Sequence, residues 1–186
     1  MTTRYLSCAE TAKLIRAQLK IEFPGVKFSV KSKTYSGGAS ITVGWTDGPT
    51  GKQVDSVVGV FAGSGFDGMI DMKYGKTAWL MPDGTASFRK TEGTTGSMGT
   101  VPSDEALQPS FKAECVHFGA DYVFTNRRYS MPKYAAAVKE LCDAYGQPMP
   151  ELVEGVCGPY SSARGWFADT GRDLETLVRC KLEGQS

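Results

Sequence analysis

The spacing of apolar residues changes near the start of the chain, and this change constrains the fold more than any other feature. Over residues 7–23 apolar side chains recur at three- and four-residue steps, the spacing of one helix face. Ser7 and Glu10 have the spacing of a capping box at the start of this helix. Over 26–30 and 41–45 apolar and polar residues alternate, which is typical of half-buried strands. The sequence therefore predicts a helix followed by a β-hairpin.

The rest of the chain adds elements of both kinds. Thr50 and Gln53 repeat the capping-box spacing, and Pro132 fits the first turn of a helix that follows Ser130. The further helices are expected over 50–61, 130–145 and 174–182, the further strands over 69–72, 79–81, 85–88, 116–118, 122–124 and 152–156, and a loop over 157–168. We therefore predict an α+β fold, in which an α-β-β-α unit is followed by further antiparallel strands and two or more helices.

A change in composition divides the sequence. Residues 90–108 are rich in Gly, Thr and Ser and contain few apolar residues. Loops of this length inside compact domains are usually functional or mobile. We therefore predict an N-terminal half over 1–89, a loop over 90–110 and a C-terminal half over 111–186, either as two packed halves or within one compact domain.

Charge and hydropathy limit the classes of function. The 186 residues carry a formal net charge of only +1, so contact with nucleic acid would require a local basic patch. No apolar run approaches the roughly 18 to 20 residues that cross a bilayer, and we expect neither secretion nor membrane insertion. The five cysteines are scattered without a CxxC pair, which favours reduced thiols in a cytoplasmic protein.

The sequence contains few candidates for catalysis, and we expect no catalytic set and no cofactor. His117 is the only histidine, and Cys115 lies two residues away on the same predicted strand face, where the two side chains point in parallel rather than toward each other. Asp47, Asp67 and Asp71 lie in glycine-rich segments. They would serve a metal-dependent enzyme, or they would accept backbone hydrogen bonds in turns.

Two groups of residues suggest binding. Aromatic residues over 118–124 precede Arg127, Arg128 and Tyr129, and such a combination either anchors a protein interface or stacks on bases. The alternative is a buried strand followed by a basic turn in water. Together with Trp166, these three residues are our candidates for contact with a partner protein.

Lysines on the first strand form the second group. Lys27, Lys31 and Lys33 lie at even spacing, and we expect them to project from one strand face. They would contact phosphates in a nucleic-acid-binding module. A solvated strand face explains the same lysines.

Four motifs, in order along the chain, resemble a large polyvalent protein associated domain, a family found in proteins of phages and conjugative plasmids. The motifs are residues 23–30, 45–50, 66–71 and 119–124, and the resemblance spans about residues 5–150. It implies a mobile-element origin, in which such domains accompany proteins delivered into a new host cell. Countering restriction or CRISPR defences is a common task there. The family supplies no catalytic residues for positions in this chain.

These observations lead to one main hypothesis. We expect a non-enzymatic accessory protein that acts in the cytoplasm of a bacterial host and inhibits a host defence complex, a protein or ribonucleoprotein, by direct contact. The alternatives are a nucleic-acid-binding module and a metal-dependent enzyme that uses the three aspartates.

Overall fold

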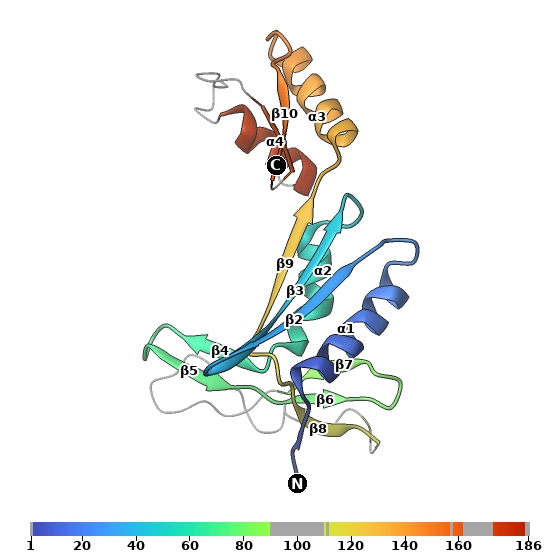
Figure 1. Cartoon of the computed structure of the whole chain (residues 1–186), viewed down its shortest axis with the longest axis vertical. Coiled ribbons are helices and arrows are strands. Elements are labelled where there is room, and N and C mark those ends of the chain that lie inside the picture. Colours follow the sequence, from blue (N-terminus) through green and yellow to red (C-terminus); the bar gives the residue numbers. More distant parts are fainter. Residues whose placement is uncertain (1, 90–109, 111, 157, 162–172, 185–186) are drawn as a thin grey trace. The chain divides into compact units, whose positions relative to one another are not determined.

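The structure of the chain is a computed structural model that describes residues 2–89, 110, 112–156, 158–161 and 173–184 (Figure 1). It confirms the α+β class. In chain order the elements are β1 (Arg4–Tyr5), α1 (Cys8–Glu22), β2 (Ser29–Tyr35), β3 (Gly38–Thr46), α2 (Gly51–Val58), the short 3-10 helix η1 (Gly59–Phe61), β4 (Ser64–Asp67), β5 (Met72–Gly75), β6 (Ala78–Leu80), β7 (Ala86–Phe88), β8 (Glu114–His117), β9 (Tyr122–Arg128), α3 (Met131–Ala144), β10 (Leu152–Gly155), β11 (Gly158–Ser161) and α4 (Leu174–Glu183).

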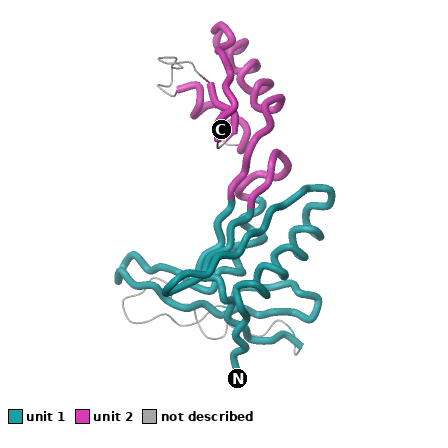
Figure 2. Tube along the Cα trace, in the orientation of Figure 1, with its two compact units in different colours: residues 1–43, 53–125 teal, residues 44–52, 126–186 magenta. Residues whose placement is uncertain are grey.

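The chain forms two compact units (Figure 2). Unit 1 contains residues 1–43 and 53–125, and unit 2 contains residues 44–52 and 126–186. The division at residues 90–110 stays a prediction, because nearly all of that segment lies outside the described residues.

Helix α1 begins and packs as its sequence pattern predicts. The Ser7 hydroxyl accepts from the Glu10 amide (3.2 Å), and the Ser7 amide donates to the Glu10 carboxylate (2.8 Å), which completes the capping box. Ala12, Ile15 and Leu19 are buried along one face of the helix. Because the apolar stripe lies on one side only, α1 has one face in the core and one in water.

A three-stranded sheet has the order β2-β3-β9, and most of its residues lie in unit 1. Along β3 the alternate residues Ala39, Ile41, Val43 and Trp45 are buried, so one face of the sheet belongs to the core and the other does not. The predicted hairpin is therefore confirmed. Its first strand begins at Ser29, three residues later than we expected.

The third strand of this sheet also differs from our expectation. We expected strand structure to end at Phe124 and a basic turn to follow, but β9 continues through Arg128. The pairing with β3 accounts for the difference, because the Asp47 amide donates to the carbonyl of Arg128 (2.8 Å) beyond the end of β3. Tertiary pairing thus extends a strand whose last residues have no apolar alternation.

A second sheet in unit 1 has the order β1-β8-β6-β7. Its first pair is parallel and its other pairs are antiparallel, with Ala78 opposite Val116 in the central pair. Trp79 and Cys115, another facing pair, are both buried. The predicted return from strand 79–81 through a turn to 85–88 is confirmed.

The hairpin β4–β5 corrects one expectation. We expected a strand over 69–72, but Met69–Asp71 form the turn of the hairpin and β5 begins at Met72. The Asp67 side chain accepts from the Met69 amide (2.9 Å), and Asp71 adopts a left-handed conformation with φ of 52°. Aspartate is among the residues that tolerate both roles, so polar turn chemistry here overrides a short apolar run.

Unit 2 contains a helix pair and a second small hairpin. Helices α3 and α4 share a buried cluster of Tyr134, Ala137, Val138, Cys142, Leu174 and Val178. Asp173 caps α4 by accepting from the Thr176 amide (2.7 Å). Strand β11 pairs with β10 in a region that we expected to be loop, because Gly158-Pro159-Tyr160-Ser161 has no strand pattern of its own. Among the described helices, none is both long and apolar enough to cross a membrane.

Two glycines allow close approach of backbone segments in unit 1. A Cβ atom on Gly119 would lie 2.2 Å from the carbonyl oxygen of Leu6, and one on Gly63 would lie 1.9 Å from that of Phe118. These distances are far shorter than any van der Waals contact, and backbone atoms on both sides cannot move aside without breaking the strand connections. The two positions therefore require glycine for space.

We predict that Gly119→Ala lowers the free energy of unfolding by about 3 kcal/mol, because overpacking against backbone forces the segments apart. Gly59→Ala is the matched control, since a Cβ there meets no atom within 4 Å. The control is expected to change stability by less than about 1 kcal/mol. Urea denaturation of the three proteins measures the difference, and equal stabilities would contradict the packing account.

Candidate functional site

Asp121 connects four strands of unit 1. Its carboxylate accepts from the Ala39 amide of β3 (3.1 Å) and the Ser64 hydroxyl of β4 (2.7 Å), and it pairs with the Lys73 ammonium group of β5 (2.8 Å). The Asp121 amide, just before the start of β9, donates to the Ala39 carbonyl of β3 (2.8 Å). This side chain therefore joins the β4–β5 hairpin to the three-stranded sheet.

The charge of Asp121 is stabilised by these contacts. The hydrogen bonds from Lys73 and Ser64 hold the pKa of the carboxyl group below its ordinary value, against the effect of partial burial. The same pair raises the pKa of Lys73. Asp121 is thus a structural anion. Gly38 leaves space for its side chain, because a Cβ atom on Gly38 would lie 2.3 Å from the Asp121 carboxylate oxygen.

One face of the β2-β3-β9 sheet is exposed among the elements that the structure describes. Val30 and the alternate residues of β3 point into the core, and the Thr125 hydroxyl of β9 donates to Asp55 of α2 (2.7 Å). Helices α1 and α2 therefore lie on this side of the sheet (Figure 1). Because side chains alternate along a strand, the neighbouring residues project from the other face. These residues are Lys31, Lys33 and Tyr35 of β2, Ser40 and Thr42 of β3, and Tyr122 and Phe124 of β9, and we call them the open face.

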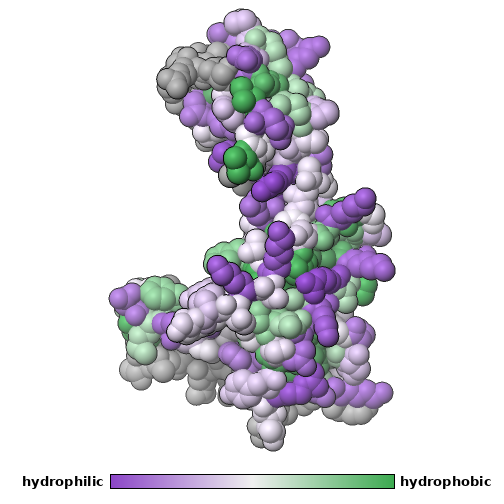
Figure 3. Space-filling model, in the orientation of Figure 1, coloured by the Kyte–Doolittle hydropathy of each residue, from purple (hydrophilic) through white to green (hydrophobic). Residues whose placement is uncertain are grey.

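The open face combines basic and aromatic side chains. Lys31, Lys33 and Tyr35 are exposed, and Phe124 is 55% exposed. Figure 3 shows hydrophilic and hydrophobic side chains interspersed over this part of the molecule. Of the three lysines we expected on the first strand, Lys31 and Lys33 share this face. Lys27 is exposed but precedes β2, so the strand geometry does not fix its direction.

The β4–β5 hairpin carries large apolar side chains outside the core. Phe66, Met69, Met72 and Tyr74 are each between 49% and 67% exposed. Phe66 lies opposite Lys73 and Met72 lies opposite Asp67, so the apolar residues occupy both faces of the two-stranded ribbon. We call Ser64–Gly75 the apolar arm, and Figure 1 shows it extending away from the three-stranded sheet.

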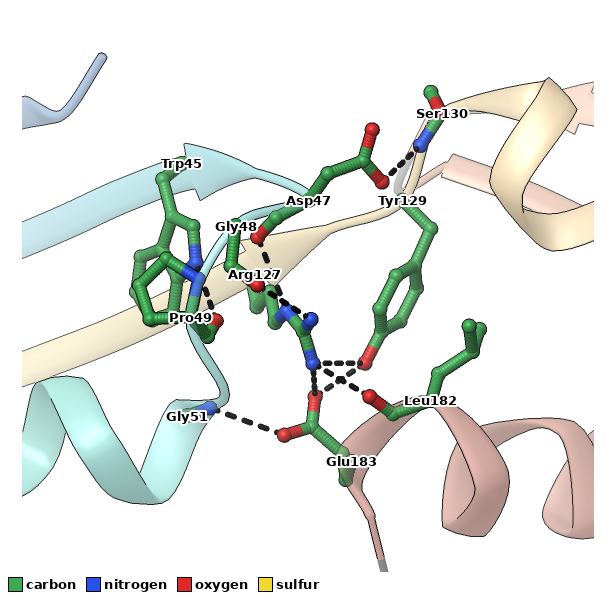
Figure 4. A network of polar contacts seen from close by, with 10 residues as sticks. All are labelled: Trp45, Asp47, Gly48, Pro49, Gly51, Arg127, Tyr129, Ser130, Leu182 and Glu183. Carbon is green, nitrogen blue, oxygen red and sulfur yellow. Dashed lines mark hydrogen bonds and ion pairs between the residues drawn. The ribbon is translucent and has the colours of Figure 1, made fainter. Parts of the chain in front are cut away.

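In unit 2 a buried arginine holds three carbonyl groups (Figure 4). The Arg127 side chain is only 5% exposed. It donates to the carbonyl oxygens of Asp47 (3.2 Å), Gly48 (3.0 Å) and Leu182 (2.9 Å). Arg127 therefore connects the turn after β3 with the end of α4, and little of its surface is available to a partner.

Glu183 and Tyr129 complete this network. Arg127 pairs with the Glu183 carboxylate (3.0 Å), which also accepts from the Tyr129 hydroxyl and from the Gly51 amide (3.0 Å). Burial and the bond to Glu183 raise the pKa of Tyr129 to about 12. Burial pushes the pKa of Glu183 upward, but the bonds from Tyr129, Gly51 and Arg127 outweigh it and hold the pKa below its ordinary value. The glutamate is therefore charged in the folded protein at neutral pH.

The turn after β3 is built by the second family-like motif. Asp47 adopts a left-handed conformation with φ of 57°, and its carboxylate accepts from the Ser130 amide (3.0 Å). The Trp45 indole donates to the Pro49 carbonyl (3.0 Å). These hydrogen bonds fix the shape of the turn, a role that aspartate commonly has in tight turns.

Two further candidates for partner contact have different outcomes. Arg128 is exposed at the end of β9, and its role in binding stays a prediction. Trp166 lies outside the described residues. Sequence reasoning missed Glu183, because nothing in the C-terminal helix pattern indicates that its last residue pairs with an arginine 56 positions earlier.

Four of the five groups that we considered for catalysis or metal binding have structural contacts, and the fifth, Asp71, lies in the turn between β4 and β5. Asp47 and Asp67 accept backbone hydrogen bonds, and the His117 ring nitrogen Nδ1 contacts the Lys76 carbonyl (2.8 Å). Cys115 is buried, with its sulfur 3.6 Å from the Thr3 hydroxyl. Within the described ranges, no three His, Cys, Asp or Glu side chains are grouped so as to hold a metal ion.

We predict that Arg127→Met lowers the free energy of unfolding by roughly 2–4 kcal/mol, because it leaves Glu183 and three carbonyl groups without their shared donor. Arg128→Met is the matched control, since it removes an exposed arginine next in sequence, and we expect a change within about 0.5 kcal/mol. Chemical denaturation of both variants measures the difference. Similar losses in the two variants would contradict the structural role of Arg127.

The network also predicts a pH dependence. Because the folded pKa of Glu183 lies below its ordinary value of 4.5, its contribution to stability is present above that value and is lost as the pH falls through the folded pKa. We expect Glu183→Gln to reduce the loss of stability between about pH 5 and pH 3. Denaturant midpoints of wild type and variant across this range provide the test, and parallel curves would contradict the assignment.

Comparison with known proteins identifies the family. The family model of large polyvalent protein associated domain 29 matches residues 6–130, more than half of the 186-residue chain. The match contains all four motifs of the sequence analysis and ends at the start of α3, short of the residue 150 that we expected. No curated protein matches the chain, and neither does any solved structure. The chain therefore belongs to the large polyvalent protein associated domain 29 family, which is associated with phage and plasmid proteins.

Proposed function

We propose that this chain is a non-enzymatic accessory protein of a phage or plasmid, and that it inhibits a host defence complex by binding to it directly. CRISPR–Cas and restriction complexes are the candidate targets, so the protein would act in the cytoplasm of the bacterial host. Membership of a family associated with mobile elements supports an origin in a phage or plasmid. The single observation that carries the binding mode is the apolar arm.

The arm exposes the kinds of side chain that dominate protein interfaces. Phe66, Met69, Met72 and Tyr74 project from twelve consecutive residues of the chain. Aromatic residues and methionine are enriched at interface cores, where lysine, glutamate and aspartate are depleted. Fully burying one such side chain is worth roughly 1.5–3 kcal/mol, so the four together supply enough free energy for a specific contact.

The geometry of the arm favours insertion into a partner rather than packing on unit 1. A two-stranded ribbon is marginally stable in water, and this one is tied to Asp121 by one residue of each strand, Ser64 and Lys73. Figure 3 shows hydrophobic residues together with hydrophilic ones at the outer part of the arm. Because apolar groups lie on both of its faces, a partner with a groove would cover both.

A transformation assay tests the proposal. We expect expression of the protein in cells with an active CRISPR–Cas or restriction system to raise the efficiency of transformation by a targeted plasmid. Met69→Ser/Met72→Ser should reduce this effect at least tenfold, because losing the burial of two side chains weakens binding by several kcal/mol. The subunits of the defence complex should copurify with the wild type and be lost from the variant.

Ile21→Ser/Val156→Ser provides the matched control, since it replaces two exposed apolar residues at other places on the surface. It should behave as the wild type in both measurements. No protection in cells carrying several defence systems would contradict inhibition of host defence. Protection that both double variants retain would contradict the apolar arm as the contact.

A further inference from the structure

We propose that the open face of the β2-β3-β9 sheet is a binding site for single-stranded nucleic acid. The inference does not depend on the inhibitory function, because the lysines and rings proposed to bind lie on β2 and β9, outside the apolar arm. It rests on the charge of the face, on its aromatic rings and on the order of its strands.

The charge of the face suits a polyanion. Lys31 and Lys33 are exposed two positions apart on β2, so both project from the same face. Within the described part of the chain, neither lysine has a carboxylate within ion-pair distance. Asp121, an acidic side chain at the margin, is already bound by Lys73 and Ser64. The protein as a whole carries a charge of only +1, so this local excess is a property of the face rather than of the composition.

The aromatic rings of the face suit unstacked bases. The rings of Tyr122 and Phe124 lie with their centroids 6.1 Å apart and their planes 31° apart on β9. Lys73 places its ammonium group 5.7 Å from the centre of the Tyr122 ring. A base that stacks on an exposed ring gains about 1–3 kcal/mol whatever its identity.

The order of the strands places the two kinds of group on either side of a shallow floor. β3 lies between β2 and β9, so lysines and rings are separated by two inter-strand spacings, about 10 Å. The floor is formed by Ser40 and Thr42, whose short side chains leave room above the strand and offer hydroxyl groups. A single strand that follows β3 would place its phosphates toward β2 and its bases toward β9.

A duplex fits this face less well than a single strand. The rings of Tyr122 and Phe124 contact bases only when those bases are unpaired and unstacked. Two lysines also provide too few phosphate contacts for duplex binding through the backbone alone. A phosphate chain carries a charge at every nucleotide for Lys31 and Lys33, whereas a protein partner would need acidic side chains placed opposite both.

Fluorescence anisotropy with labelled 15-nucleotide probes tests the inference. The probes are single-stranded DNA, single-stranded RNA and a DNA duplex, each titrated at several salt concentrations. We expect binding of at least one of the two single strands and weaker binding of the duplex. The comparison of single-stranded DNA with single-stranded RNA shows which nucleic acid the protein prefers. Lys31→Ala/Lys33→Ala should reduce the slope of log affinity against log salt by about 1.4, since each phosphate contact of a single strand contributes about 0.7.

Substitutions at one aromatic position separate stacking from apolar contact. Phe124→Leu keeps an apolar side chain but removes the ring, and should weaken binding between about fivefold and 150-fold. Phe124→Trp keeps a ring and should retain the affinity. Because Phe124 is 55% exposed, neither change should alter the thermal unfolding midpoint by more than a few degrees.

The controls lie elsewhere in unit 1. Lys13→Ala/Lys20→Ala removes two exposed lysines of α1, and should leave both affinity and salt slope unchanged. Met69→Ser/Met72→Ser should bind the oligonucleotides as the wild type does, which separates this inference from the proposed function. No binding to any probe at low salt would overturn the inference, even if a protein partner were found on this face. Equal losses in the two lysine variants, or full affinity of Phe124→Leu, would overturn it as well.

Discussion

The carboxylate of Asp121 is the interaction on which unit 1 depends. It receives an amide from β3, a hydroxyl from β4 and an ammonium group from β5, and all three strands are thereby fixed to the start of β9. Removing such a partly buried anion would leave its donors unpaired, which is more costly than the bonds themselves are favourable. Gly63 and Gly119 bring the adjoining backbone segments close enough for these bonds to form. The position of the apolar arm and the edge of the open face both follow from this junction.

Several residues of the motifs that identify the family have structural roles. Gly119 and Asp121 build the junction of unit 1. Asp47, at the turn after β3, binds the Ser130 amide, and Asp67 closes the turn of the apolar arm by accepting from the Met69 amide. The motif residues therefore hold a shape. Both proposed binding surfaces combine exposed residues outside the motifs with exposed motif residues such as Phe66, Met69 and Phe124.

Local patterns in the sequence were sufficient for much of the fold. The capping box at Ser7, the apolar stripe of α1 and the alternation along β3 each depend on neighbours within a few residues, and each prediction was confirmed. The strand over 69–72 was wrong because a short apolar run in an aspartate-rich turn resembles a strand. The continuation of β9 to Arg128 was missed because it depends on pairing with β3, about 80 residues earlier in the sequence.

The candidate surfaces were predictable only in part, for the same reason. Even spacing on β2 correctly grouped Lys31 with Lys33, but nothing local indicated that Tyr122 and Phe124 lie across β3 from them. Arg127 was interpreted as a surface anchor because its partner Glu183 is distant in the sequence, and the structure makes it an internal donor instead. Residue type alone suggests binding, whereas burial decides which arginine is available for it.

The central claim is that Asp121 holds the strands that carry both binding surfaces. Hydrogen–deuterium exchange of wild type and Asp121→Ala tests it most directly, because it reports on individual amide groups. We predict faster exchange in the variant at Ala39 and along β4 and β5, with amides in the middle of α1 exchanging as in the wild type. An unchanged exchange pattern at Ala39 and in the hairpin would show that the junction does not hold these strands, and the account would be wrong.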